Sequence, residues 1–373
     1  MKNLISLALI SLLILGCNSQ EEAQIVDLER NDQVSIFDLV DSISVVKLET
    51  NSDCLLKFIY QIYFHKNKFY IFDERQNSIF CFDKNGKFLF KIDDKGRGPK
   101  EYEYTQYVYI DNKNDQIIIL VPWGFILYYD LGGKFIEKVE LPKELNSYSE
   151  VYSLNKDTLL FISTNEYRAS YYSRSKNRLI KRFLKTTKEQ MVEMIPVHKT
   201  YTFNDSLFFN DNSVNSRIIN LSDSTNPVKY SWNFGKDSNT IKQINDLNSF
   251  KESQMKQNKS IENDKIYIDK KYPNYYPFYS IESKRYRGIS INHRGCYKSI
   301  FFDKTNKKYL VINKTIEGIK PLTYLRYGNA IVEDHSDNNS TLIINILNDK
   351  QKKIIQSHNP DTDNPFLIIY HIK

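Results

Sequence analysis

Residues 58–102 read FIYQIYFHKNKFYIFDERQNSIFCFDKNGKFLFKIDDKGRGPKEY, a stretch in which apolar and polar residues alternate and Tyr, Phe and Ile dominate. Such alternation is typical of antiparallel strands that bury one face. Turn-forming residues divide the stretch, among them Asp83-Lys-Asn-Gly86, whose glycine can take the positive φ that closes a hairpin. The pattern predicts four short strands: Phe58–Phe64, Lys68–Asp73, Ser78–Asp83 and Lys87–Ile92. One such meander cannot bury both of its faces, so it must pack against similar units.

Similar units recur along the chain. The second strand of each unit begins at one of six positions: Lys68, Gln116, Thr158, Ser206, Gly288 and Gly328. These starts are 40 to 48 residues apart, except for one step of 82 residues. A period in the forties that is built from four strands is typical of the blades of a β-propeller. The sequence therefore predicts an all-β, six-bladed β-propeller of four-stranded antiparallel blades over residues 34–373.

The long step predicts a helical insertion between blades 4 and 5, over residues 236–276. Its apolar residues recur at helical spacing: Ile241, Ile244, Leu247 and Phe250. Apolar residues at the same spacing predict a second helix, in blade 6, over Ser340–Ile355 with Ser340 as N-cap. Blade 6 then needs strands from both ends of the chain, with Phe366–Lys373 as its third strand and Ser42–Glu49 as its fourth. Such closure removes the free sheet edges.

The N-terminus has the features of a bacterial export signal. Lys2 precedes the apolar run Leu4–Leu15, which is too short for a comfortable transmembrane helix. The following Ile14-Leu-Gly-Cys17 resembles the lipobox, in which the cysteine becomes the lipidated N-terminus. We therefore predict a lipoprotein signal peptide at residues 1–16 and a lipidated tether at residues 17–33. A plain signal peptide followed by a chance cysteine is the alternative. The lipid would anchor the protein in the cell envelope, at the outer membrane, on its periplasmic or surface face.

The net charge of the 373-residue chain is +7, but basic and acidic residues are interleaved throughout. No basic run is long enough to follow a phosphate backbone, so no nucleic-acid partner is expected. A solvated surface explains the charge, and an anionic partner is the alternative.

Besides Cys17, the chain has Cys54, Cys81 and Cys296, an odd number without metal-type spacing. Free buried thiols are the simpler interpretation of these three residues. A disulfide from Cys54 to Cys296 or to Cys81 is the alternative in an oxidising compartment.

The order of these features resembles a known family. The lipobox, the strand SISVVKLET, the stretch around KFYIFD and the closing DNPFLIIYHIK follow one another as in the six-bladed β-propeller lipoproteins of Bacteroidetes. The most specific pieces are the segment GRGPKEY at residues 96–102, where relatives tend to show Gly-x-Gly-Pro-Gly-Glu-Tyr, and Asp363-Asn-Pro365. Lys100 replaces the usual third glycine. The resemblance implies an NHL-like propeller and an envelope address rather than a particular activity.

Candidate ligand-binding residues lie mainly in predicted loops. The segment at 96–102 lacks the ending of a phosphate-binding loop. It is either a rigid turn or a rim loop that presents Arg97 and Glu101 to a ligand. Trp123 could stack on a sugar ring or a peptide side chain, or could pack between blades. The predicted ligand-binding residues are Arg75, Arg97, Glu101, Trp123, Arg285 and Arg326.

The sequence predicts no catalytic residue and no metal ligand. It has no Gly-x-Ser-x-Gly elbow and no recognisable pair of catalytic carboxylates. His293 and His335 end the second strands of adjacent predicted blades and could meet at one face, although loop histidines are more often solvated. Asp73 and Asp211 hold the same strand-end position as His293, but other residues interrupt that ring, which argues against a symmetric metal cage. We expect no cofactor, with a divalent metal as the alternative.

Together these features predict a cell-envelope lipoprotein that acts as a non-catalytic binding or interaction module for a glycan or protein ligand on one propeller face. The rival is an NHL-like propeller enzyme, a metal-assisted lyase or a lactonase or other hydrolase, with its site on the axis. A third class is a structural partner in an outer-membrane uptake complex, which would present a large exposed apolar patch. Propellers serve all three classes, so the fold alone does not choose among them.

Overall fold

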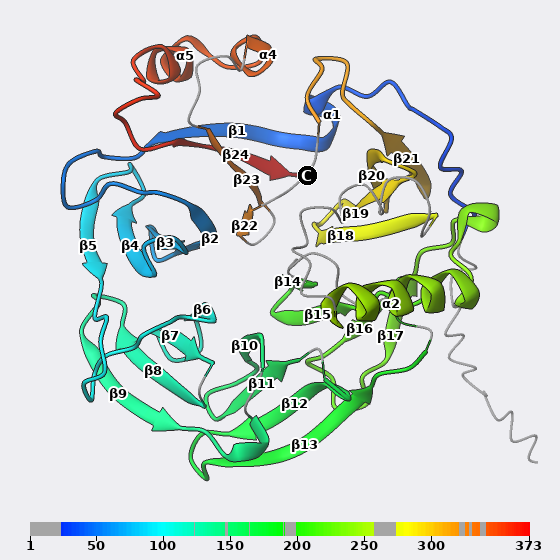
Figure 1. Ribbon diagram of the computed structural model, residues 1–373. Coiled ribbons are helices and arrows are strands. Elements are labelled where there is room, and N and C mark those ends of the chain that lie inside the picture. Colours follow the sequence, from blue (N-terminus) through cyan, green and yellow to red (C-terminus); the bar gives the residue numbers. More distant parts are fainter. Residues whose placement is uncertain are drawn as a thin grey trace, which may run out of the picture.

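A computed structural model describes residues 24–122, 124–145, 148–163, 165–188, 190, 199–256, 274–320, 325–327, 330–335 and 341–373. Within these residues the strands form six four-stranded antiparallel sheets, and Figure 1 shows the sheets arranged in a ring. One edge strand of each sheet lies next to the central axis, and the other three strands follow outward. The prediction of an all-β propeller built from four-stranded antiparallel blades is therefore confirmed.

Five of the sheets are built from four consecutive strands each, in the order from the axis outward. Sheet 1 contains β2 (Ile59–His65), β3 (Lys68–Asp73), β4 (Ser78–Asp83) and β5 (Phe88–Ile92). Sheet 2 contains β6 (Tyr107–Asp111), β7 (Gln116–Val121), β8 (Phe125–Asp130) and β9 (Phe135–Glu140). Sheet 3 contains β10 (Glu150–Ser153), β11 (Thr158–Ile162), β12 (Tyr167–Ser173) and β13 (Arg178–Lys185).

The remaining consecutive sheets flank the helical insertion. Sheet 4 contains β14 (Thr200–Phe203), β15 (Ser206–Asn210), β16 (Arg217–Asn220) and β17 (Val228–Ser231). Sheet 5 contains β18 (Tyr275–Glu282), β19 (Tyr286–His293), β20 (Cys296–Asp303) and β21 (Lys308–Ile312). The predicted second strands of sheets 1 to 4 start at the predicted residues, and β19 starts two residues before the predicted Gly288.

Sheet 6 is assembled from both ends of the chain. Its strands are β22 (Leu325–Tyr327), β23 (Ala330–His335), β24 (Phe366–Ile372) and β1 (Val40–Lys47). The closing strand β24 pairs with β1 from Phe366 opposite Lys47 to Ile372 opposite Val40. On its other edge β24 pairs with β23. The prediction that the two chain ends supply the third and fourth strands of this sheet is confirmed.

The core consists of apolar side chains packed between adjacent sheets. The middle strands β3 and β7 are buried along nearly their whole length. Neighbouring sheets cover both of their faces, which explains why their sequences are almost continuously apolar. The outermost strands, such as β9, carry exposed residues. One apolar cluster also joins Phe80 of sheet 1 to Leu367 of β24, so the closing strand is packed as well as hydrogen-bonded.

The helices occupy connections between strands. They are α1 (Ile36–Leu39), α2 (Ile241–Lys256), α4 (Thr341–Ile344) and α5 (Asp349–Gln356), with single 3-10 turns η1 (Lys143–Leu145) and η2 (Gly235–Asp237). The helix α2 lies between sheets 4 and 5, as predicted, and buries Ile244 and Leu247. The single helix predicted over Ser340–Ile355 is wrong, because the chain forms two helices there. The first helix, α4, ends at Ile344, and Asn348 has an extended conformation and caps α5. Ser340 lies outside the described residues.

The packed chain begins earlier than the predicted boundary at residue 34. Val26 and Leu28, which belong to the predicted tether, are buried in a cluster with Trp232 and Phe234. The Val26 N–H also donates to the Asn233 carbonyl at 2.8 Å. The tether prediction is therefore wrong for Val26 and Leu28, because both side chains pack against an apolar surface beside η2. The predicted signal peptide and Cys17 lie outside the described residues.

The three other cysteines are free thiols. Cys54 and Cys81 are buried, as expected, and burial raises the pKa of the Cys81 thiol to about 12. Cys296 is exposed, so the expectation of a buried thiol is wrong there. The reason is its place at the first position of β20, directly after a two-residue turn.

Candidate binding site

The meander topology gives the ring two rims. The turns between first and second strands and between third and fourth strands lie at one rim, here called the pocket rim. The turns between second and third strands, together with the connections from one sheet to the next, lie at the connection rim. Lys113, between β6 and β7, is at the pocket rim, and Arg75, between β3 and β4, is at the connection rim.

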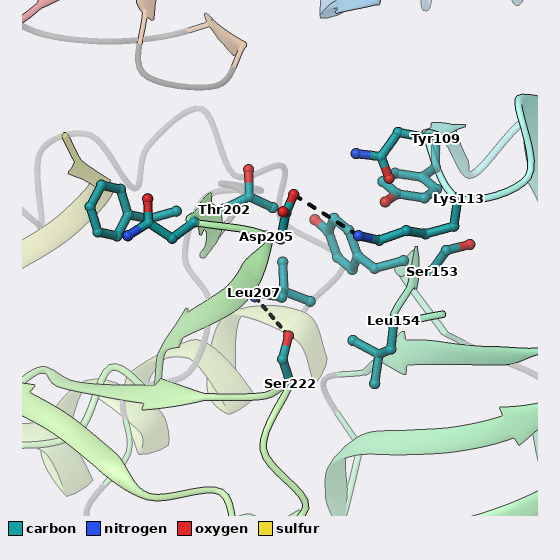
Figure 2. A pocket seen from close by; sticks show the side chains of 12 residues that line it. Tyr109, Lys113, Ser153, Leu154, Thr202, Asp205, Leu207 and Ser222 are labelled. Carbon is teal, nitrogen blue, oxygen red and sulfur yellow. Dashed lines mark hydrogen bonds and ion pairs between the residues drawn. The ribbon is translucent and has the colours of Figure 1, made fainter. Parts of the chain in front are cut away.

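A cavity of about 220 Å³ lies at the pocket rim. Its walls come from sheets 2, 3 and 4, and Figure 2 shows their side chains converging from these sheets. The apolar part of the lining consists of Tyr109, Tyr152, Leu154, Phe203 and Leu207. The polar part consists of Asn112, Lys113, Ser153, Thr202, Asn204, Asp205 and Ser222. Pockets for drug-sized ligands have volumes of roughly 300 to 1,000 Å³, so this smaller cavity suits a single ring-sized group.

An ion pair joins two of the surrounding sheets at the cavity. The Lys113 ammonium of sheet 2 lies 4.0 Å from the Asp205 carboxylate of sheet 4 (Figure 2). The Asp205 side chain is 88% exposed. Exposed ion pairs of this kind contribute only about 0 to 1 kcal/mol to the stability of a protein, so a ligand can separate the two groups at little cost.

The Ser153 hydroxyl is the buried polar group of the cavity that has no hydrogen-bond partner among the described residues. Its residue is 7% exposed and ends β10. A buried hydroxyl without a partner costs free energy, which a ligand that hydrogen-bonds to it would recover.

A chain of hydroxyl groups lies behind the cavity and crosses four inner strands. The Tyr63 hydroxyl of β2 is 3.1 Å from that of Tyr107 in β6, which is 2.7 Å from that of Tyr152 in β10. Tyr152 donates to the Glu150 carboxylate at 2.5 Å and lies 2.5 Å from the Thr200 hydroxyl of β14. Because the Tyr152 ring also lines the cavity, this network fixes the orientation of one cavity wall.

The tyrosines of this network act as hydrogen-bond donors. Burial is the main reason that the pKa values of Tyr107 and Tyr152 are raised well above their ordinary value. The nearby Glu150 carboxylate raises both pKa values further. Both phenols therefore stay protonated at physiological pH.

A second polar cluster lies at the same rim, between sheets 4 and 5. Glu282, at the end of β18, is 2% exposed and forms ion pairs at 2.7 Å with both Lys229 and Lys304. Tyr201 of β14 donates to the same carboxylate at 3.1 Å. Burial by itself would raise the pKa of Glu282, but hydrogen bonds from the two lysines outweigh burial and lower it. This carboxylate is fully engaged by protein groups.

The GRGPKEY segment is a rigid turn held by its own side chains. A carboxylate oxygen of Glu101 accepts a hydrogen bond from Gly98 N–H at 2.8 Å. A Cβ added at Gly96, whose φ is +153°, would meet the same oxygen at 1.9 Å. The Glu101 side chain therefore closes over the glycines, which favours the structural interpretation of this segment.

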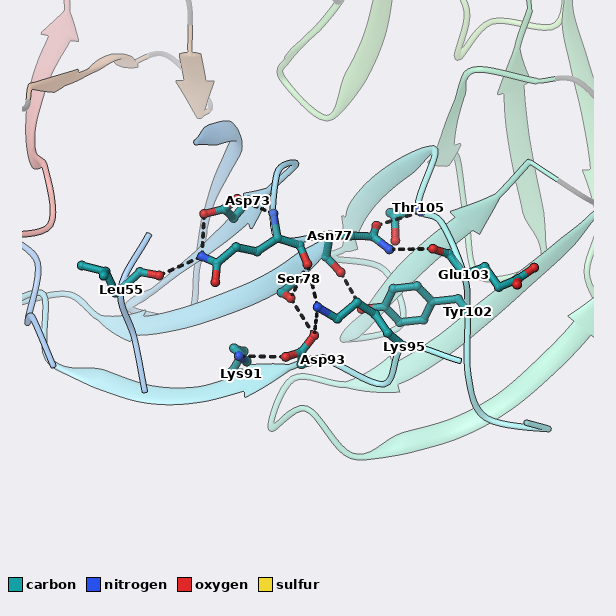
Figure 3. A network of polar contacts seen from close by, with 11 residues as sticks. Leu55, Asp73, Asn77, Ser78, Lys91, Asp93, Lys95, Tyr102, Glu103 and Thr105 are labelled. Carbon is teal, nitrogen blue, oxygen red and sulfur yellow. Dashed lines mark hydrogen bonds and ion pairs between the residues drawn. The ribbon is translucent and has the colours of Figure 1, made fainter. Parts of the chain in front are cut away.

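A polar network fixes this turn to sheet 1, as Figure 3 shows. Asp93 accepts from Ser78 at 2.8 Å and forms ion pairs with Lys91 and Lys95, each at 2.8 Å. Asn77 accepts from Thr105 N–H at 2.9 Å, and its own carbonyl accepts from the Tyr102 hydroxyl at 3.3 Å. The network explains why the loop between two sheets has a defined conformation.

The predicted ligand-binding residues do not form one patch. Arg75 and Arg97 lie at the connection rim, whereas Arg285, between β18 and β19, lies at the pocket rim. Arg97 is exposed and pairs with Glu103. Arg75 lies over the Phe58 ring. Arg285 is held by Asp303 at 2.8 Å. Arg75 and Arg97 are therefore separated from Arg285, because the meander sends these turns to opposite ends of the ring.

Two predicted ligand-binding residues cannot be assigned a contact. Trp123 lies outside the described residues. Arg326 belongs to β22, at the axis, and its side chain lies outside the described part of the chain.

The strand-end aspartates hold turns. Asp73 accepts from Lys57 N–H at 2.5 Å and from Gln76 N–H at 2.9 Å. Asp211 accepts from Arg217 Nε at 2.7 Å. The side chain of His335, which the sequence pairs with His293, lies outside the described part of the chain.

The axial tyrosines and Glu150 were not among the site residues predicted from the sequence. A signal was present, because the segment before the predicted second strand at Gln116 contains tyrosine at alternate positions, in YVYID at residues 107–111. Alternation shows that such residues share a face, but it does not show whether that face meets another sheet or the axis.

The ring of four-stranded sheets places this protein in the class of β-propellers. Within that class, the chain belongs to the family described as a domain of unknown function, DUF4934, which it matches over residues 23–371. A comparison with curated proteins found no match.

Solved structures share the fold at low sequence identity. One is a protein of Bacteroides fragilis NCTC 9343 described as a candidate exported protein, with a TM-score of 0.72, 18% identity and coverage of 92% of this chain and 98% of that one. Another is a DUF4221 family member from Bacteroides vulgatus, with a TM-score of 0.52, 9% identity and coverage of 89% and 98%. At these identities the similarities show the fold alone. Among the described residues, no helix is long and apolar enough to cross a lipid bilayer.

Proposed function

We propose that this protein is a six-bladed, lipid-anchored envelope protein that binds the end of a neutral glycan in the pocket-rim cavity, without catalysis. The observation that carries the proposal is the convergence of aromatic rings from sheets 2, 3 and 4 on a cavity that also contains the unpartnered Ser153 hydroxyl. Sheet 6 counts as the sixth blade in this proposal, because it has the same four-stranded order as the others.

The chemistry of the lining favours a sugar ring. The rings of Tyr109, Tyr152 and Phe203 line the cavity and offer apolar surface to the C–H groups of a pyranose. Ser153 and the amides of Asn112 and Asn204 can hydrogen-bond to its hydroxyl groups. Lys113 and Asp205 balance each other in charge, so the cavity favours a neutral ligand.

The proposed location in the cell envelope is inferred from the N-terminal segment. The lipobox-like Ile14-Leu-Gly-Cys17 supports a lipid anchor at Cys17 as the link to a membrane, and the exported description of the Bacteroides fragilis neighbour agrees with export. An outer-membrane position would place the cavity where glycans meet an uptake complex, the partner we propose for this protein.

Metabolic labelling with a palmitate analogue should mark wild type and not Cys17→Ala.

Binding is tested by calorimetry with a panel of neutral mono- and oligosaccharides, using the full-length chain. Ser153→Ala should weaken binding of the best saccharide roughly threefold to tenfold, since one hydrogen bond contributes about 0.5 to 1.5 kcal/mol. The same substitution should leave the melting temperature unchanged or raise it slightly, because it removes a buried hydroxyl that has no partner in the described residues.

Arg97→Ala is the matched control, since Arg97 is exposed at the connection rim, away from the cavity. It should bind the same saccharide as wild type does. Equal weakening by Arg97→Ala and Ser153→Ala, or no saccharide binding by the wild type, would contradict the proposal. Conversion of the saccharide during the titration would favour the rival enzyme.

A further inference from the structure

Three side chains with metal-binding donors meet at the connection rim, whereas the cavity lies at the pocket rim. Glu29 comes from the N-terminal segment, Asp237 from η2 and His293 from the end of β19. One donor atom from each residue lies within 4.8 Å of the other two. The set therefore joins three separate parts of the chain.

Two of the three residues are buried, and His293 Nε2 lies 3.6 Å from Asp237 Oδ1, which is longer than a hydrogen bond. Asp237 is 1% exposed and His293 is 4% exposed. The Oδ2 atom of Asp237 and the Nε2 atom of His293 have no hydrogen-bond partner among the described residues. Buried polar atoms are normally satisfied, so these two atoms indicate a ligand.

An arginine supplies the positive charge in the structure as it stands. Arg294 donates to Asp237 Oδ1 at 2.8 Å, and its other terminal nitrogen is 3.5 Å from Glu29 Oε1. The Arg294 side chain is 57% exposed, so it can leave toward solvent when another cation enters. Glu29 is equally exposed and can move inward.

We propose that Glu29, Asp237 and His293 form a binding site for a divalent metal ion of the zinc class. One imidazole and two carboxylates match zinc, which takes nitrogen and oxygen ligands at about 2.0 to 2.2 Å and keeps an open position where only three protein ligands are present. Calcium and magnesium prefer sites made of oxygen alone. Such a ligand set departs from the sequence expectation of no metal.

Metal binding would fasten the N-terminal segment to the ring. Val26 and Leu28 already pack beside η2, and Glu29 follows them directly. A metal bridging Glu29 to Asp237 and His293 would lock this segment at the point where the chain continues toward its predicted anchor.

The test titrates zinc chloride into the chelator-treated full-length chain by calorimetry, with metal content measured after dialysis. We expect one zinc ion per chain and a rise in melting temperature of about 3 to 5 °C at a hundredfold excess over the dissociation constant. His293→Ala should weaken zinc binding at least about tenfold, as loss of a metal ligand does. Arg294→Ala should tighten it, because the competing guanidinium is gone.

Two further measurements distinguish this site from zinc capture elsewhere on the chain. Cys296→Ser should bind zinc as wild type does, which excludes capture by the exposed thiol. Zinc should slow trypsin cleavage at Arg30 in wild type but not in His293→Ala. Undiminished zinc binding by His293→Ala, or weaker binding by Arg294→Ala, would overturn the proposal. The saccharide titration is independent of both outcomes.

Discussion

At the scale of single residues, the Asp-x-x-Gly turns show how local sequence specifies backbone conformation. Asp83 Oδ1 accepts from Asn85 N–H at 2.8 Å and from Lys87 N–H at 2.9 Å. Asp130 makes the equivalent pair of hydrogen bonds at the same distances in sheet 2. Each turn ends with a glycine at positive φ, +86° for Gly86. These turns are predictable because the hydrogen bonds accepted by each aspartate side chain lie within five residues.

Gly86→Ala should destabilise the protein by about 2 kcal/mol or more. The new Cβ would lie 2.0 Å from the Lys47 carbonyl oxygen, and alanine is strained at this φ. Thermal unfolding followed by circular dichroism measures the effect. Gly132→Ala is the control, because its Cβ would approach nothing nearer than 3.2 Å and no positive φ is required there. Equal stability of the two variants would show that Gly86 does not need its positive φ.

The binding-site residues illustrate the opposite case at the same scale. Nothing local distinguishes Tyr152, which lines the cavity, from Tyr172, which does not, and both pack in the same apolar cluster. The difference arises from the strands that carry them, since β10 lies at the axis and β12 lies two strands further out. Sequence patterns give the face of a strand, but the position of the strand in its sheet is a tertiary property.

At the scale of elements, the strands were predictable and their ion pairs were not. The four strands predicted between residues 58 and 92 agree with β2 to β5 within one residue at each end. The cluster around Glu282, by contrast, joins the end of β18 to Lys229 of β17 and to Lys304 after β20. It forms because adjacent sheets bring their turns to one rim.

Glu282→Gln should destabilise the protein by about 3 kcal/mol at pH 7, because two partly buried lysines lose their buried counter-charge. The pKa of Glu282 is lowered in the folded state, so its contribution is present above the ordinary value of 4.5 and is lost as the pH falls through the folded-state value. The stability difference between wild type and variant should therefore shrink at pH 3. Urea unfolding of wild type and variant at pH 7 and pH 3 measures this difference in the free energy of unfolding.

Glu166→Gln is the matched control for this prediction, since the Glu166–Lys185 pair is more than half exposed on both sides. Its stability should stay within about 0.5 kcal/mol of wild type at both pH values. If Glu282→Gln also changed the stability by less than about 0.5 kcal/mol at both pH values, solvent would screen the ion pairs of Glu282.

At the scale of the whole molecule, the ring depends on contacts between the chain ends. Asn364 is fully buried, accepts from Leu56 N–H at 2.7 Å and donates to the carbonyls of Glu49 and Cys54. Glu49 N–H in turn donates to the Gly86 carbonyl at 2.7 Å. The closing motif Asp363-Asn-Pro365, noted as specific in the sequence, thus ties β24 to the segment between β1 and β2.

Deletion of residues 366–373 should abolish cooperative unfolding, because it removes β24 from the middle of sheet 6 and opens the ring. Calorimetry should show a broad, low transition, and limited proteolysis should cut the chain near both ends. A full-length chain extended by eight Gly and Ser residues is the control for an altered C-terminus. A truncated chain with the wild-type melting temperature would show that closure is dispensable.

The sequence by itself determined the strands, their turns, the repeat of four-stranded units, the closure by both chain ends and the helix between sheets 4 and 5. These features depend on apolar periodicity, on turn residues and on the need to pair every sheet edge. Only the tertiary structure decided which turns share a rim, which tyrosines reach the axis and that Glu29, Asp237 and His293 meet. These depend on how sheets distant in sequence are placed around the ring, and no local pattern encodes that placement.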